Sequence, residues 1–579
     1  MEVDPQIQIQ GETYPQSHQL PGQVLNPALG YSYQSSDIDR VKRFLCLGTE
    51  LNYYRAGQQH RRFSRSEVQA IDRLIQDGRG EEVVRLIRDI SFQGRACKQG
   101  PALYALAVCA RSNDLKTKHA AYSVLGDVCR IPTHLFQFIK FCQEMSSYET
   151  GWGRAHRRAI SQWYTDFSLP NSKKNPLKLA YLVTKYKSRY RFSHRDIIRL
   201  AHVKSKNRSI RMIIQNILKK KKKESAIDSE SQEVQEFLEA VEQVKSVETE
   251  EQLAKLIALH QLAKEHIPTR FLKDSLEVWK VLFRQMPMGA MIRNLGKMSE
   301  LGMHETVDAK TFWVDLIVER LADDIALANA RIHPFTLLVA FHQYSKGKSQ
   351  NGKLKWMPNE RIKKALEEAF YRLTEMLPPA EQRYLLAVSI GENMQKEICG
   401  SSIKASEAAA SMVLSTVRKA NAEVIAFSDK IDDAYIARID KRDDVTTVRD
   451  KIFQIPRRVG RKSVPQDLSV PFKWSASRKD KFSAIIVYTD SITSCGNMHP
   501  AEAVKQYSQY MALPDLRLVV VSMTSDKYTI AAPDDINCLD VVGFDMHTPK
   551  IIMDFCEGCR QREPDMDVYL HDAEEDMIS

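Results

Sequence analysis

The spacing of apolar residues changes near Pro378, and this change sets the fold class of the chain. Before Pro378 apolar residues recur at helical spacing, four, four and three apart, as in Ile362, Leu366, Phe370 and Leu373. Residues at this spacing lie on one face of a helix. The chain from Asp37 to Leu377 is therefore predicted to form antiparallel helix pairs. Such pairs favour an α-solenoid, although no clean sequence period is present.

After Pro378 the apolar residues occur in short runs that are rich in branched side chains. These runs are Tyr384 to Ile390, Glu423 to Phe427, Ala484 to Tyr488 and Leu516 to Ser522. Helical segments lie between them, at Ser401 to Ala420 and Ala501 to Met511. Strands that alternate with helices predict a parallel sheet covered on both faces, which is a Rossmann-type α/β domain.

The two ends of the chain differ from its middle. Residues 1–36 lack periodicity and are predicted to be a disordered arm, whereas 561–579 form an acidic tail. The predicted domains between them span 37–378 and 379–560. No run approaches the roughly 20 apolar residues of a membrane span, and the ten cysteines are scattered. We expect an intracellular monomer without membrane contact, in the cytoplasm and also in the nucleus.

Basic residues are concentrated in one segment, from Arg154 to Lys223. This segment holds 21 Lys and Arg against two acids, Asp166 and Asp196, whereas the whole chain carries a net charge of +11. The segment therefore carries +19 and the rest of the chain −8. Clustered cations bind nucleic acids because they displace the counterions condensed on the phosphates. The distribution predicts a nucleic-acid partner.

Helical spacing divides the segment into two cationic stripes. Lys185 and Arg189 are four apart and are predicted to share a helix face. Ser193 and Asp196 have the spacing of a capping box, and the helix that they start would carry Arg195, Arg199 and His202. With Lys187, these five cationic residues are the candidate RNA contacts, interleaved with the aromatic residues Tyr186, Tyr190 and Phe192.

Two other interpretations of the basic segment stay open. Lys and Arg also solvate the outer faces of ordinary helices, although such faces usually mix charges of both signs. The run from Lys219 to Lys223 is typical of a flexible loop or a nuclear-import signal rather than of a specific contact.

Several long strings along the chain resemble the TROVE-domain RNA-binding proteins, the family founded by the SS-A/Ro autoantigen. They run in order from the first helices to the end of the helical region. The strings start at Arg43 (RFLC), Leu74 (LIQDGRG), Arg130 (RIPTHLF), Trp152 (WGRA), Thr184 (TKYK), Arg293 (RNLGKM), Arg331 (RIHPF) and Gly352 (GKLKW).

The resemblance implies a ring of HEAT-like helical repeats that a von Willebrand factor A-like domain closes. It implies that Y RNAs bind the outer surface, and that 3′ ends of misfolded noncoding RNAs, such as ribosomal RNA precursors, enter the central hole. The Y RNA contacts of the family fall on Lys185, Arg189 and His202. These three residues are also among those that the charge pattern selects.

One departure from the family concerns a magnesium site in the A-like domain. The family's Asp-x-Ser-x-Ser loop corresponds to Ser389-Ile390-Gly391-Glu392-Asn393, which lacks the leading carboxylate and both hydroxyls. A later threonine corresponds to Gln466, whereas Asp490 is retained. Magnesium prefers octahedral oxygen ligands that include carboxylates. We therefore expect a degenerate site and no metal cofactor, unless Glu392 compensates.

No sequence motif points to catalysis. The chain has no Walker loop, G-x-G-x-x-G, H-E-x-x-H or nucleophile elbow, and His304-Glu305 lacks the second zincin histidine. Cys556 and Cys559 form one C-x-x-C pair, which cannot complete a zinc site alone. The prediction is an RNA-binding protein that is not an enzyme. The alternative is a scaffold whose A-like domain binds protein partners.

Overall fold

The structure is a computed structural model of the 579-residue chain. It describes residues 19, 23–25, 31–34, 36–47, 63–93, 99–146, 151–168, 175–219, 228–303, 312–330, 332, 334–349, 353–374, 380–396, 404–453, 466–490, 498–523, 528–531, 535, 537–542, 552–553 and 555–557. The acidic tail, Lys220 to Lys223, His304, Glu305 and Cys559 lie outside the described residues.

The described chain is helical from Asp37 to Thr374, as the apolar spacing predicts. The first helices are α1 (Asp37–Leu47), α2 (Gln69–Gln76), α3 (Gly80–Phe92), α4 (Gly100–Ala110), α5 (Leu115–Ser123), α6 (Leu125–Val128), α7 (Pro132–Glu144), α8 (Arg154–Thr165), α9 (Pro176–Lys185), α10 (His194–Ala201) and α11 (Arg208–Leu218). They are followed by α12 (Ser229–Gln243), α13 (Glu250–His260), α14 (Thr269–Asp274), α15 (Leu276–Gln285), α16 (Met288–Glu300), α17 (Phe312–Ala322), α18 (Asp324–Asn329), α19 (Pro334–Ser345) and α20 (Glu360–Thr374).

The apolar positions of these helices form one core. In α20 the predicted face is buried, since Ile362, Leu366, Phe370 and Leu373 are each at most 1% exposed. Two helical glycines allow neighbouring segments to approach closely. A Cβ on Gly80 would lie 1.8 Å from the Thr117 hydroxyl, and one on Gly296 would lie 2.8 Å from the Trp356 ring. Larger residues would therefore separate these elements.

The C-terminal region is an α/β domain, which we call the A-like domain. Its six-stranded sheet has the order β11-β9-β8-β5-β6-β7. The strands are β5 (Ala380–Ser389), β6 (Ala420–Phe427), β7 (Tyr435–Ile436), β8 (Ala484–Thr489), β9 (Arg517–Ser522) and β11 (Cys538–Val542), and only β7 is antiparallel. The main helices are α21 (Ala405–Lys419), α22 (Val445–Ile452), α23 (Val470–Ser477) and α24 (Pro500–Tyr510).

Alternate residues of the central strands enter two cores, as expected for a sheet that is covered on both faces. Leu386 and Ile486 share a core with α21 and with the helical region, whereas Leu385 and Ile485 pack with α23 and α24. The predicted strands and helices of this domain are confirmed.

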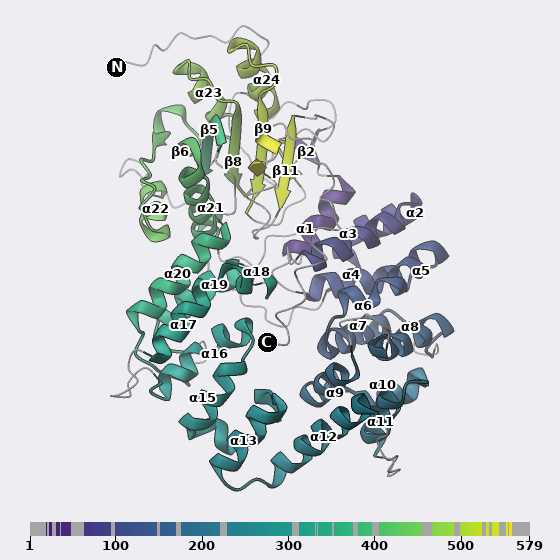
Figure 1. Ribbon diagram of the computed structural model, residues 1–579. Coiled ribbons are helices and arrows are strands. Elements are labelled where there is room, and N and C mark those ends of the chain that lie inside the picture. The colour runs from purple at the N-terminus through teal and green to yellow at the C-terminus, as the bar shows by residue number, and fades with distance from the viewer. Residues whose placement is uncertain are drawn as a thin grey trace.

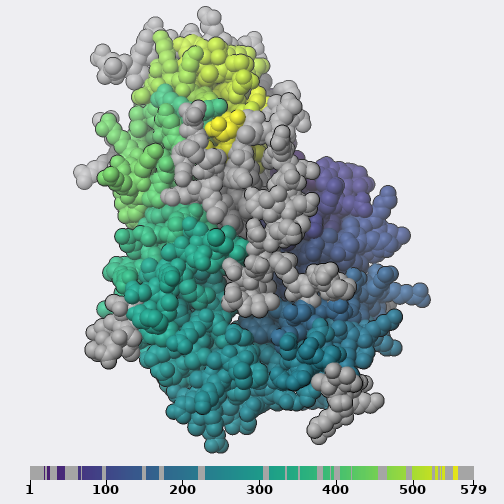
Figure 2. Space-filling model, viewed as in Figure 1, coloured from purple at the N-terminus to yellow at the C-terminus, as the bar shows by residue number. Residues whose placement is uncertain are grey.

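The helices curve round so that both ends of the helical region meet the A-like domain (Figure 1). On one side α1 packs against β11. On the other side α20 packs against α21, and the Val445 backbone N–H donates to the Tyr371 hydroxyl at 3.0 Å. In the space-filling view the teal helices and the green A-like domain form a continuous surface (Figure 2).

The N-terminal segment also contacts the A-like domain. Strands β1 (Gln23–Leu25) and β2 (Tyr31–Gln34) form an antiparallel sheet with β10 (Tyr528–Thr529). The prediction of a disordered arm over 1–36 is therefore wrong for these two strands. Both strands are short and lack apolar periodicity, and β2 pairs with β10 about five hundred residues away, so no local pattern predicts this sheet.

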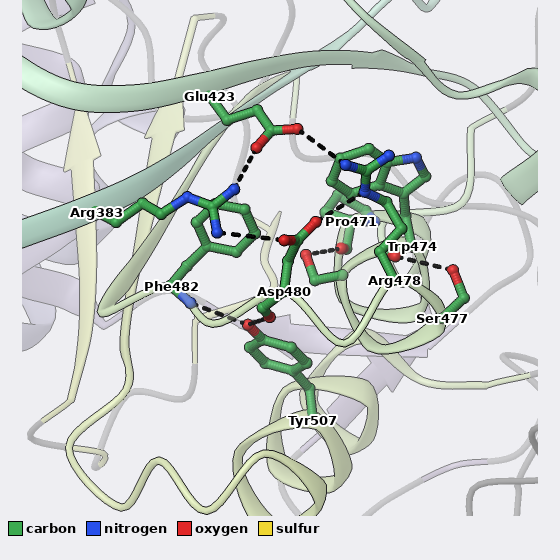
Figure 3. A network of polar contacts seen from close by, with 10 residues as sticks. Arg383, Glu423, Pro471, Trp474, Ser477, Arg478, Asp480, Phe482 and Tyr507 are labelled. Carbon is green, nitrogen blue, oxygen red and sulfur yellow. Dashed lines mark hydrogen bonds and ion pairs between the residues drawn. The ribbon is translucent and has the colours of Figure 1, made fainter. Parts of the chain in front are cut away.

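Charged residues at the start of β5 form a closed set of ion pairs, which we call the charge ring (Figure 3). The Arg383 guanidinium lies 2.6 Å from Glu423 and 3.2 Å from Asp480. The Arg478 guanidinium lies 2.7 Å from Asp480 and 3.7 Å from Glu423. Two cations and two anions therefore alternate, and each cation contacts both anions.

Candidate nucleic-acid interface

The predicted site residues lie between the end of α9 and the end of α10. A two-stranded hairpin, β3 (Ser188–Arg189) and β4 (Phe192–Ser193), joins the two helices. Figure 1 places α8 and α10 on the outer side of the curved helical region. The site thus consists of the end of α9, the hairpin of β3 and β4, and the short helix α10.

The predicted capping box at Ser193 is confirmed. The Asp196 backbone N–H donates to the Ser193 hydroxyl at 3.3 Å, and the Ser193 backbone N–H donates to the Asp196 carboxylate at 2.9 Å. These hydrogen bonds with Ser193 lower the pKa of Asp196. They start α10 directly after β4 and so fix the helix relative to the hairpin.

The prediction that Lys185 and Arg189 share a helix face is wrong. Helix α9 ends at Lys185, because Tyr186 has φ −110° and ψ 69°. Arg189 instead lies in β3, where it pairs with Phe192. Helical spacing alone could not reveal this, since the backbone hydrogen bonds of the hairpin compete with another helical turn.

The hairpin turn consists of Tyr190 and Arg191, with φ values of +52° and +66°. Two-residue turns of type I′ require positive φ at both central positions and favour Asn-Gly there. Left-handed conformation costs a residue with a Cβ about 1–2 kcal/mol. Two neighbouring side chains are thus held at the tip of the hairpin despite backbone strain.

Lys185 is the least exposed of the candidate residues, with 13% of its side chain accessible. Its ammonium lies 3.7 Å from the Glu265 carboxylate and 5.3 Å from the ring centroids of Tyr181 and Tyr186. Burial disfavours the charged form, but the two tyrosines and Glu265 outweigh it and the pKa of Lys185 is raised. The residue therefore stays cationic and has one carboxylate partner.

A buried neutral histidine contacts the side chain of Thr184, the residue before Lys185. His266 Nδ1 accepts from the Ala263 backbone N–H at 3.0 Å, so its Nε2 carries the hydrogen. That nitrogen lies 3.1 Å from the Thr184 hydroxyl, to which it donates. Burial, with Lys187 and Lys185 nearby, lowers the pKa of His266 to about 4.

A second neutral histidine contacts the backbone of Tyr186, the residue after Lys185. His194 Nε2 lies 3.0 Å from the Tyr186 carbonyl oxygen, which can only accept, so this nitrogen donates. Nδ1 then accepts from the Tyr164 hydroxyl at 2.7 Å. Burial lowers the pKa of His194 to about 3. Together the two histidines hold the end of α9 from both sides.

The other candidate residues are exposed, and none of them makes an ion pair with a carboxylate of the described chain. Arg195 and Arg199 lie on α10, as predicted. His202 is not the last member of a helical stripe, because it ends α10 in a left-handed conformation with φ +52°. We call Lys185, Lys187, Arg189, Arg195, Arg199 and His202 the basic surface.

Sequence reasoning missed the residues that support this surface. His194 lies on the buried face of α10 with Ile197, Ile198 and Ala201, so its spacing could have identified it as a supporting residue. Glu265 and His266 come from a short 3-10 helix (Lys264–His266) about 80 residues from Lys185. No local pattern connects them with the basic surface.

The residues expected at a degenerate metal site do come together in the A-like domain, in what we call the amide network. The Asn393 amide donates to one carboxylate oxygen of Asp490 at 2.6 Å. The side-chain amide N–H of Gln466 donates to the other carboxylate oxygen of Asp490. The Ser389 hydroxyl donates to the side-chain carbonyl oxygen of Gln466. Asp490 is only 2% exposed.

These contacts do not fit a divalent cation. A cation would need the Asp490 oxygens as ligands, but a side-chain N–H group, which carries partial positive charge, points at each of them. Within the part of the chain that the structure covers, no three His, Cys, Asp or Glu side chains are grouped to hold a metal. The Cys556 thiol is buried, and burial raises its pKa to about 12, which disfavours the metal-binding thiolate.

Comparisons with known proteins agree with this architecture. Residues 24–343 match the TROVE domain, and 383–556 match the Ro60 vWA domain. The chain is 33% identical to "RNA-binding protein RO60" of Caenorhabditis elegans, over 93% of this chain and 90% of that protein. The Deinococcus radiodurans protein of the same name is 31% identical, over 93% and 96%.

A solved structure shows the same fold. The crystal structure of the Deinococcus radiodurans RO (RSR) protein aligns with 91% of this chain and 100% of its own, with a TM-score of 0.66 and 28% identity. No helix in the described ranges has the length and apolar character needed to span a bilayer. A helical TROVE region followed by a vWA domain, with relatives named as RNA-binding proteins, identifies this chain as a member of the Ro60 family of RNA-binding proteins.

Proposed function

We propose that this chain binds small structured noncoding RNAs of the Y RNA type on its basic surface. The observation that carries the proposal is the absence of ion pairs between its exposed cations and the described carboxylates. Elsewhere in the chain exposed arginines have such partners, as in the charge ring. Cations without a protein partner are available to phosphates.

The geometry suits a folded RNA better than an extended strand. Arg189 lies on the hairpin, Arg195 and Arg199 on α10, and Lys185 at the end of α9. These elements are fixed to one another by the capping box and by the two buried histidines. A rigid array of cations fits the phosphate positions of a preformed stem, because double-stranded RNA is recognised mainly by shape.

We further propose that misfolded noncoding RNAs, such as ribosomal RNA precursors, are a second class of ligand, whose 3′ ends enter the centre of the helical ring. The ring-like course of the helices in Figure 1 and the family membership support this role in RNA quality control. We assign 37–378 to the RNA-binding domain and 379–560 to the A-like domain, and expect the protein in the cytoplasm and nucleus.

A binding titration with a Y-type stem-loop RNA tests the main proposal. We expect the variant Lys185→Ala with Arg189→Ala to bind about 100-fold more weakly, since each lost phosphate contact is worth about 1.5 kcal/mol. Lys363→Ala with Lys364→Ala is the matched control, because it removes the same charge from α20, where both lysines have ion-pair partners. Equal affinity of both variants would contradict the proposal and favour a scaffold role.

A further inference from the structure

The tip of the hairpin between β3 and β4 has an unusual backbone. Seven non-glycine residues of the described chain have positive φ, and Tyr190 and Arg191 are the only two that are adjacent. The others, such as His202 and Lys219, are single residues, and those two end helices. Asn-Gly would form the same turn with less strain. The turn therefore holds an aromatic and a basic side chain at an energetic cost.

The Tyr190 ring lies apart from the aromatic residues near it in the sequence. Tyr186 and Phe192 are half-buried and pack against the core, whereas Tyr190 is 38% exposed. Its hydroxyl makes no hydrogen bond with any residue that the structure describes. Packing and hydrogen bonding thus give no sufficient reason for a tyrosine at this position.

Two cations lie near the ring. The Lys140 ammonium from α7 lies 5.2 Å from the centroid of the Tyr190 ring, and the Arg189 guanidinium carbon lies 5.8 Å from it. Arg189 makes no ion pair with a carboxylate of the described chain, whereas the Lys140 ammonium lies 3.5 Å from the Glu144 carboxylate. An exposed ring can stack on a base while cations beside it contact the adjoining phosphates.

We propose that Tyr190 is a base-stacking site for one unpaired nucleobase of the bound RNA. The proposal rests on the proposed RNA-binding function and adds a ligand class to it. A surface that read only the phosphates of a stem would need no aromatic ring, and Asn-Gly would serve its turn better. An unpaired base, by contrast, exposes a π-face that an aromatic side chain can stack on.

The variant Tyr190→Asn removes the aromatic ring and keeps the hairpin turn, so it tests the role of the ring alone. Asparagine tolerates positive φ, so the hairpin stays formed and the thermal midpoint should equal or exceed that of the wild type. We expect about tenfold weaker binding of a stem-loop RNA with one bulged base, and unchanged binding of a fully paired stem of the same length. Tyr190→Phe keeps the ring and should bind both RNAs as the wild type does.

A fluorescent base reports stacking directly. With 2-aminopurine as the bulged base, the wild type and Tyr190→Phe should change its fluorescence on binding, whereas Tyr190→Asn should not. The stacking site would be overturned if Tyr190→Asn bound the bulged RNA as tightly as the wild type does. It would also be overturned if the variant lost the same affinity for the bulged and the paired RNA. Either result would leave the proposed phosphate-binding surface intact. Failure of the wild type to bind either RNA would overturn the proposed function itself.

Discussion

The basic surface and the charge ring use similar side chains in opposite ways. In the charge ring two arginines and two carboxylates alternate within 3.7 Å, so each charge has partners inside the protein. On the basic surface the exposed cations have no described carboxylate as a partner. The two regions therefore differ in the position of their acids rather than in the number of their cations.

The amide network extends the comparison to a site that contains a carboxylate. The side-chain amides of Asn393 and Gln466 donate hydrogen bonds to the two carboxylate oxygens of Asp490. A buried carboxylate needs such donors because desolvation without partners is costly. Asp490 and the charge ring therefore have partners inside the A-like domain, whereas the exposed cations of the basic surface have no described carboxylate partner.

Charge reversal should have opposite effects on RNA affinity and on thermal stability in the two regions, and these are the largest effects that we expect. Arg195→Glu with Arg199→Glu should weaken Y-type RNA binding about 10³-fold, from two lost contacts of about 1.5 kcal/mol and two new repulsions of about 0.5 kcal/mol. The same variant should unfold at nearly the wild-type temperature. Arg478→Glu should instead lower the thermal midpoint and leave RNA affinity unchanged. If both variants lose RNA binding equally, only net charge matters and the comparison breaks.

Magnesium should not stabilise the wild-type protein. The thermal midpoint should be the same in 10 mM MgCl₂ and in EDTA, because the amide network leaves no carboxylate oxygen of Asp490 for a cation. Restoring the family pattern with Ser389→Asp, Gly391→Ser, Asn393→Ser and Gln466→Thr should create a site worth about 3 kcal/mol at 100 times its Kd. A magnesium-dependent midpoint in the wild type would refute the degenerate site.

Acidification should destabilise the support of the basic surface. The pKa of His194 is lowered to about 3 and that of His266 to about 4, below the ordinary value of 6.5. The unfolded chain therefore binds more protons below pH 6.5, and stability falls as the pH falls from about 6.5 towards 4. At pH 5 each histidine contributes a loss of about 2 kcal/mol. His194→Gln should reduce this pH dependence of the thermal midpoint, and an unaltered dependence would count against the assignment.

The smallest effect concerns Glu265, the acid whose carboxylate pairs with Lys185. Glu265→Gln removes the carboxylate 3.7 Å from the Lys185 ammonium, so RNA affinity should rise about threefold, or ~0.7 kcal/mol. Glu277→Gln is the matched control, since it removes a carboxylate that pairs with Lys280 on α15. A similar gain in the control would show a general effect of net charge and no local competition.

Much of the fold could be predicted because it follows local periodicity. The buried face of α20 and the strands β5, β6, β8 and β9 were visible as apolar patterns. The pairing of β2 with β10 could not be predicted, because these two strands are far apart in the chain. At the site, the capping box and the cations of α10 were predictable from short spacings.

The rest of the site depends on tertiary structure. Lys185 and Arg189 have helical spacing, but strand pairing of Arg189 with Phe192 ends the helix before it. The carboxylate of Glu265 and the ring of His266 reach Lys185 and Thr184 only through the packing of distant segments. The sequence therefore identified a cluster of cationic residues. The structure shows which of these residues have a carboxylate partner within the described chain.

The salt dependence of RNA binding tests the central claim most directly. A plot of log Kd against log salt concentration should be steep for the wild type, with affinity for the stem-loop RNA falling about 10³-fold between about 50 and 200 mM salt. In Lys185→Ala with Arg189→Ala the slope should decrease by about two phosphate contacts. A nearly flat wild-type plot, or an unchanged slope in the variant, would contradict RNA binding through the basic surface.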